Sequence, residues 1–157
     1  MATRSSAYGS FDHGVQYFTV RDPQFMQAIT EVPGSSAILG SGYVTYSNEA
    51  KMTMLGVNED IIDTFGAVSV AVAWAMAQGA LKKSGADIAV AISGVAGPDG
   101  GTANKPVGTV VFAVALKGQN PEDVVGDKKA FGEDKSRADI RAFATLYALE
   151  LLLPPAP

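Results

Sequence analysis

Residues 93–101 read Ser-Gly-Val-Ala-Gly-Pro-Asp-Gly-Gly, and residues 105–108 read Lys-Pro-Val-Gly. This stretch lies between two apolar runs, Asp87–Ile92 and Thr109–Leu116, which suit buried strands and are too short for typical helices. Glycine permits positive φ angles and lets a ligand approach the main chain, and consecutive free N–H groups can hold a phosphate or an oxyanion. The pattern predicts two strands joined by a loop that is either a wide turn or a binding site.

The rest of the chain alternates strand and helix signals. Helices are predicted where a capping residue precedes an apolar stripe of helical period. Their predicted starts are Asp22, Ser47 or Asn48, Asn58, Ser69 and Ser136. Further strands are predicted over Val15–Val20, Tyr43–Tyr46 and Lys128–Phe131. This order indicates an α/β fold, a single-domain sandwich with a largely parallel sheet flanked by helices.

Boundaries and buried faces follow from the same pattern. Residues 1–14 are expected to be an irregular N-terminal segment, and residues 15–157 to form the domain. Gly85 is a predicted helix stop. Three helices have predicted apolar faces: Ile61, Ile62 and Phe65; Val72, Trp74, Ala75, Met76 and Ala80; Ile140, Phe143, Ala144, Tyr147 and Leu151.

Composition excludes several classes of protein. The chain has 157 residues, 47% hydrophobic, with a net charge of −4, no cysteine and one histidine. Disulfides and thiolate chemistry are excluded, and His13, in a polar segment, is expected to be an exposed loop residue rather than a zinc ligand. A carboxylate-bound Mg²⁺ is not excluded by composition, but no cluster of Asp or Glu indicates one, so no metal site is predicted. Basic residues are not clustered as nucleic-acid binding requires, and no apolar run is long enough to span a membrane. We expect a cytoplasmic protein, because no secretion signal is recognisable.

Three blocks of sequence carry a resemblance to a known family. Residues 93–108 are similar to the signature loop of the CinA C-terminal domain family, or nicotinamide mononucleotide deamidases, which reads Thr-Gly-Ile-Ala-Gly-Pro, then Gly-Gly, then Lys-Pro-Val-Gly. Val-Pro-Gly-Ser-Ser at 32–36 leads to Tyr-Ser-Asn-Glu-Ala-Lys at 46–51. Gly-Ala-Val-Ser at 66–69 leads to Met-Ala-Gln-Gly-Ala at 76–80. The resemblance runs from about Val32 to the end of the chain and implies the family's fold.

The resemblance implies a catalytic group of residues. In the family, the tyrosine and lysine that match Tyr46 and Lys51 belong to the active site, and the lysine activates a serine nucleophile. Counting back without gaps places that serine on Thr19, but the surrounding Glu-Ser-Cys-Thr-Gly-Gly motif is absent, with Phe18 and Val20 beside the threonine. Without the resemblance, Lys51 would be a surface lysine, Tyr46 a core aromatic and Thr19 an ordinary strand residue. Two other residues, Ser35 and Ser36, could supply a substitute hydroxyl.

The resemblance also implies a binding site for a nucleotide. Ser93 replaces the family's loop threonine and keeps its hydroxyl, so it joins the catalytic candidates. The backbone at Gly94, Gly97, Gly100 and Gly101 would cradle phosphate, and Lys105 would add charge. Two arginines match the family, Arg137 and Arg141, and their spacing places them on one helical face, where arginine binds phosphate with a planar fork. The alternative is a loop lysine and two solvated helix charges.

Two functions remain open at this stage. The first is a nicotinamide-nucleotide amidohydrolase, which converts nicotinamide mononucleotide and water to nicotinate mononucleotide and ammonia without a metal or organic cofactor. The second is a catalytically degenerate relative that keeps the fold and acts as a nucleotide-binding or assembly module. Intact Tyr46, Lys51 and signature loop favour the first, and the missing motif around Thr19 favours the second. The resemblance further implies a homo-oligomer, with no nucleic-acid or membrane partner expected.

Overall fold

The chain divides into two units, residues 1–45 and 46–157, and the computed structural model describes residues 4–6, 9–11, 33 and 40–152. In the first unit, β1 (Arg4–Ser6) pairs antiparallel with β2 (Gly9–Phe11). The predicted strand Val15–Val20 and the predicted helix from Asp22 lie outside the described residues. The expected domain start at residue 15 stays a prediction.

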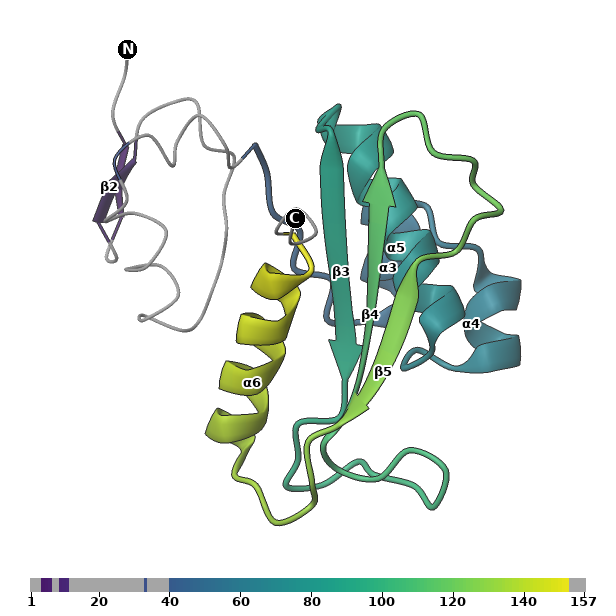
Figure 1. Cartoon of the computed structure of the whole chain (residues 1–157), viewed down its shortest axis with the longest axis vertical. Coiled ribbons are helices and arrows are strands. Elements are labelled where there is room, and N and C mark those ends of the chain that lie inside the picture. Colours follow the sequence, from purple (N-terminus) through teal and green to yellow (C-terminus); the bar gives the residue numbers. More distant parts are fainter. Residues whose placement is uncertain (1–3, 7–8, 12–32, 34–39, 153–157) are drawn as a thin grey trace, which may run out of the picture. The chain divides into compact units, whose positions relative to one another are not determined.

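The second unit is a three-stranded sheet with helices on both faces (Figure 1). Its strands are β3 (Ile88–Gly94), β4 (Thr109–Leu116) and β5 (Gly126–Ala130), in the order β3-β4-β5. Helix α5 (Val70–Ser84) packs on one face, with α3 (Asn48–Leu55) and α4 (Glu59–Phe65) against it. Helix α6 (Arg137–Glu150) packs on the other face, so the expected α/β sandwich is confirmed.

Strand β4 forms the centre of the core. Every residue from Thr109 to Ala115 is buried, because helices cover both faces of the sheet. Such burial accounts for a continuous apolar run in place of alternating apolar and polar residues. On the α6 face, Phe112 packs with Ile140 and Ala144, and its ring lies edge-on to that of Tyr147 at 4.8 Å between centroids.

The expected largely parallel sheet is wrong for the described strands. Both pairs are antiparallel, with Ile92 opposite Phe112 and Phe112 opposite Asp127. Parallel neighbours require a crossover connection, usually a helix. Residues 95–108 and 117–125 contain no helix and lead the chain back beside the preceding strand. Alternation of strand and helix signals did not reveal that these two connections lack a helix.

Four predicted helix starts are confirmed by their caps. The side chains of Ser47, Asn58, Ser69 and Ser136 each accept a hydrogen bond from a backbone N–H in the first turn of α3, α4, α5 and α6. These bonds satisfy N–H groups that have no partner within a helix. Gly85 ends α5 with a φ of 69°, as predicted.

Three local predictions are wrong, and one concerns the apolar face of α6, because Phe143 is 40% exposed. Residues 43–46 form no strand in the structure, although their β-branched and aromatic side chains favour one. Phe65 is 53% exposed, whereas Ile62 on the same helix is buried. Since α4 has only seven residues, its apolar period does not define a long buried face, and the last side chain lies in solvent.

Close packing between α3 and α5 depends on Gly79. A Cβ atom at this position would overlap the carbonyl oxygen of Leu55, the last residue of α3. The absent side chain therefore lets the end of α3 approach the middle of α5.

We predict that Gly79→Ala destabilises the protein by about 3 kcal/mol, because it forces α3 away from α5. At an uncrowded helical position the same change raises the free energy of unfolding by roughly 1 kcal/mol. A loss of stability in Gly79→Ala would therefore indicate the close contact between α3 and α5. Thermal unfolding measures the effect, and Lys82→Ala, an exposed change in the same helix, is the control. A Gly79→Ala protein as stable as the wild type would contradict this packing.

A cluster of three polar side chains connects β5 with α6. Asp127 accepts hydrogen bonds from Tyr147 Oη at 2.5 Å and Lys129 Nζ at 2.8 Å, and Lys129 Nζ lies 4.5 Å from the centroid of the Tyr147 ring. The hydrogen bonds from Lys129 and Tyr147 lower the pKa of Asp127 to about 2.

This shift makes the cluster sensitive to acid. An aspartate whose pKa is lower in the folded than in the unfolded state stabilises the fold above about pH 4, and that contribution is lost towards pH 2. We expect the melting temperature of Asp127→Asn to fall less between pH 4 and pH 2 than that of the wild type. Asp87→Asn, which removes the exposed pair with Lys117, is the control. Equal pH dependence in Asp127→Asn and the wild type would contradict the assignment.

Candidate functional site

The signature loop connects β3 to β4 and is closed by its own backbone. Val95 N–H donates to Thr109 O and Gly108 N–H donates to Val95 O, both at 2.8 Å. Farther out, Thr102 and Lys105 exchange two backbone hydrogen bonds of 3.0 Å. These bonds give residues 95–108 a defined shape without helix or strand.

Three of the four candidate glycines are required by packing within the protein. A Cβ at Gly94 would lie 2.8 Å from a methyl of Val110, and one at Gly97 would lie 2.7 Å from a methyl of Val107. At Gly101 it would lie 2.8 Å from Val107 N. Gly100 differs: its φ of 92° requires glycine, yet the nearest atom to a Cβ there is 3.9 Å away. The space above Gly100 is therefore open to a ligand.

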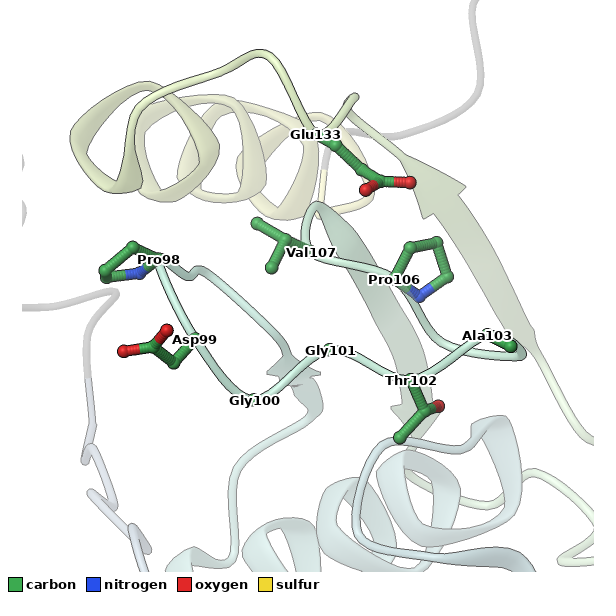
Figure 2. A pocket seen from close by; sticks show the side chains of 9 residues that line it. All are labelled: Pro98, Asp99, Gly100, Gly101, Thr102, Ala103, Pro106, Val107 and Glu133. Atoms are coloured by element: carbon green, nitrogen blue, oxygen red, sulfur yellow. The ribbon is translucent and has the colours of Figure 1, made fainter.

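An open pocket of about 510 Å³ lies over this part of the loop (Figure 2). It is lined by Pro98, Asp99, Gly100, Gly101, Thr102, Ala103, Pro106, Val107 and Glu133. Within the described residues, the backbone N–H groups of residues 99–101 donate no hydrogen bond. The carboxylates of Asp99 and Glu133 lie on opposite sides of the pocket (Figure 2). The loop thus offers free N–H groups in a pocket whose charged side chains are acidic.

A smaller pocket of about 260 Å³ adjoins the first at the start of α6. It shares Pro98, Val107 and Glu133 with the larger pocket and adds Ala96, Lys135, Ser136 and Arg137. Lys135, Arg137 and the positive end of the α6 dipole bring positive charge to this pocket, which Glu133 in the same lining partly offsets. The charge of Lys135 is partly offset by Asp134, whose carboxylate lies 2.6 Å away and raises the pKa of Lys135.

Arg137 joins α6 to the signature loop, and Arg141 does not. The Nη1 of Arg137 donates to Gly97 O at 2.8 Å, which fixes the guanidinium beside the loop. Arg137 also lines the smaller pocket. Arg141, one turn farther along α6, is half-buried and lines neither pocket. The structure therefore separates two arginines that the sequence pattern treats alike.

Ser93 and Lys105 also bind backbone, on the side of α4. Ser93 Oγ donates to Ala67 O at 2.8 Å, and Lys105 Nζ donates to Phe65 O at 2.7 Å. Neither residue lines either pocket. Both side chains thus connect the loop to the segment between α4 and α5.

Lys51 and Tyr46 lie apart from these pockets. Lys51, in α3, is only 5% exposed, and its Nζ donates to Tyr46 O at 3.4 Å. Burial lowers the pKa of Lys51, which favours the neutral amine that a base requires. The Tyr46 side chain is 90% exposed, and neither residue lines either pocket. Thr19, Ser35 and Ser36 lie outside the described residues, so their distance from Lys51 stays open.

Sequence reasoning missed two features of the site. Glu133 lines both pockets, but a glutamate in the charged stretch Glu133–Lys135 gives no signal in the sequence. The carbonyl groups of Phe65 and Ala67 also give no signal, because the Gly-Ala-Val-Ser block at 66–69 predicts only the helix start at Ser69. Among described residues, no group of three or more His, Cys, Asp or Glu side chains could hold a metal ion. No described helix is long and apolar enough to cross a membrane.

Comparison with known proteins places this loop in a family. The CinA C-terminal domain model matches residues 24–154. Nicotinamide-nucleotide amidohydrolase PncC of Escherichia coli K12 is 49% identical over 127 residues, which cover 80% of this chain and 73% of that protein. A putative competence-damage inducible protein of Symbiobacterium thermophilum is 64% identical over 91 residues. That match covers 58% of this chain but only 21% of the relative, so the chain spans a small part of that longer protein.

Two solved structures of this family have the same fold. The competence/damage inducible protein CihA from Agrobacterium tumefaciens superposes with a TM-score of 0.75 at 45% identity, covering 82% of this chain and 76% of that chain. The Escherichia coli CinA superfamily protein ECK1530/EC0983 superposes with a TM-score of 0.72 at 33% identity over 82% of this chain and 72% of that one. Signature loop, fold and sequence agree, and the chain belongs to the CinA C-terminal domain family.

Proposed function

We propose that this chain is a nicotinamide-nucleotide amidohydrolase, which hydrolyses the carboxamide of nicotinamide mononucleotide to a carboxylate and ammonia. The observation that carries the proposal is the 49% identity to the Escherichia coli protein of that name over 80% of this chain. The signature loop supports it, because its residues 99–101 line an open pocket and their N–H groups donate no hydrogen bond within the described residues.

In this proposal, Lys51 is the general base. A hydroxyl nucleophile, with Thr19 as the candidate and Ser35 or Ser36 as substitutes, attacks the carboxamide carbon while Lys51 accepts its proton and Tyr46 assists. Lys51 then returns the proton to the leaving amine, ammonia departs, and water hydrolyses the acyl intermediate. The buried position of Lys51 supports this role, because the lowered pKa leaves more of the amine unprotonated.

The two pockets suit different parts of the substrate. The 5′-phosphate is assigned to the smaller pocket, where Arg137 and Lys135 supply positive charge at the start of α6. The larger pocket has Asp99 and Glu133 as its charged lining and no Lys or Arg, so it suits the positively charged pyridinium ring better than the phosphate.

A second function is a binding or assembly module without turnover. One observation favours it: the family match begins at residue 24, so Thr19 lies before the matched region. The nucleotide pocket would remain while the covalent step is lost. A cytoplasmic location and assembly into a homo-oligomer also remain proposals, supported by the resemblance to nucleotide-processing relatives.

We expect ammonia release from nicotinamide mononucleotide, abolished to below about 1% in Lys51→Met because no base remains. Methionine keeps the length and apolar stem of the buried side chain, so the fold should persist. Lys82→Met, an exposed lysine in α5, is the matched control and should retain full activity. Turnover that survives in Lys51→Met would remove Lys51 from the mechanism. Binding without turnover in the wild type would establish the second function.

The pH dependence provides an independent check on the base. The rate should rise with pH as Lys51 loses its proton and then level off. Since burial lowers the Lys51 pKa, the midpoint should lie below the ordinary lysine value of about 10.4. Initial rates from pH 6 to pH 10, with melting curves to verify folding, measure it. A rate that falls over this range while the protein stays folded would contradict a lysine base.

A further inference from the structure

Three consecutive carbonyl groups between α4 and α5 each accept a hydrogen bond from a side chain. Lys105 Nζ donates to Phe65 O at 2.7 Å, Ser69 Oγ to Gly66 O at 2.9 Å, and Ser93 Oγ to Ala67 O at 2.8 Å. The Ser69 bond is a local one, because Ser69 is the N-cap of α5 and lies three residues from Gly66. The other two donors come from the signature loop and the end of β3. The segment of residues 65–69, called the α4–α5 connection here, is thus bound to the loop twice.

The Lys105 ammonium group is hydrogen-bonded to the C-terminal end of helix α4. Phe65 is the last residue of α4, where unpaired carbonyl groups and the helix dipole attract a cation. Gly66, whose φ of 77° favours glycine, leaves room beside the ammonium, since a Cβ there would lie 2.9 Å from Lys105 Nζ. A charge-assisted hydrogen bond to this carbonyl holds Lys105 away from a substrate.

In the sequence, the two bonds lie on either side of residues 98–103, which form most of the lining of the larger pocket. Ser93 precedes the loop and Lys105 follows its outer turn, so residues 98–103, which line the larger pocket, run between them. Arg137 holds the intervening Gly97 from the α6 side. Of these three side chains, only Arg137 lines a pocket. The geometry separates the residue that can reach a ligand from two that hold the backbone.

We propose that Lys105 and Ser93 are positioning residues, which hold the signature loop on the α4–α5 connection and do not contact the nucleotide. Their hydrogen bonds fix residues 98–103, which line the larger pocket, before a ligand arrives. The inference rests on the proposed function for the identity of the ligand, and it reassigns two residues that the family resemblance had placed in contact with it.

Removal of the phosphate from the ligand distinguishes contact from positioning. Calorimetry with nicotinamide mononucleotide and with nicotinamide riboside, which lacks the phosphate, gives the ratio of the two affinities for each variant. Lys105→Met should weaken both ligands by a similar factor, roughly tenfold, and leave their ratio unchanged. Arg137→Met should weaken nicotinamide mononucleotide several-fold more than the riboside, because that side chain is assigned to the phosphate that only the mononucleotide carries. A ratio that falls in Lys105→Met as it does in Arg137→Met would overturn the proposal.

Hydrogen exchange of the free protein tests the proposal without any ligand. Lys105→Met and Ser93→Ala should each speed amide exchange in residues 96–103 and 65–69, whereas Lys128→Met, an exposed change on β5, should not. Lys105→Gln, which keeps a donor, should restore part of the protection and replaces Lys105→Met should that variant unfold. Unchanged exchange in a folded Lys105→Met protein would overturn the proposal. A wild type that binds neither ligand would refute the proposed function, and the exchange result would still decide this inference.

Discussion

The antiparallel pairing of β3 with β4 is the constraint on which the rest of the structure depends. It makes residues 95–108 a connection that leaves the sheet and returns beside it, rather than a crossover helix. Because β4 is buried on both faces, the ends of this connection are fixed by the core. The candidate binding site therefore stands on the most buried strand of the described fold, and its shape follows from hydrogen bonds made outside the sheet.

Those hydrogen bonds connect three separate parts of the chain. The loop is bound to the end of α4 by Lys105, to the α4–α5 connection by Ser93 and to the start of α6 by Arg137. Each bond runs from a side chain to a backbone carbonyl group, so it depends on the path of the main chain more than on the identity of the accepting residue. The arrangement supports a preformed loop, which lowers the entropic cost of ordering N–H groups around a ligand.

Local signals in the sequence predicted where the described helices begin, whereas the contacts between distant parts of the chain could not be predicted from the sequence. The caps Ser47, Asn58, Ser69 and Ser136 act within four residues, and all four helix starts were found. Strand direction depends on whether a connection contains a helix, and there the prediction failed. The partners of Ser93, Lys105 and Arg137 lie 26 to 40 residues away, so no spacing rule reveals them. Resemblance identified these residues, but only the structure shows which groups they bind.

The most direct measurement is a crystal structure of the chain with the product, nicotinate mononucleotide. The account predicts the phosphate at the start of α6 within hydrogen-bond distance of Arg137, the pyridine ring over Gly100, and Lys105 still bound to Phe65 O. A nucleotide bound away from the signature loop would contradict the proposed site. A Lys105 side chain turned from Phe65 to the phosphate would contradict the positioning role.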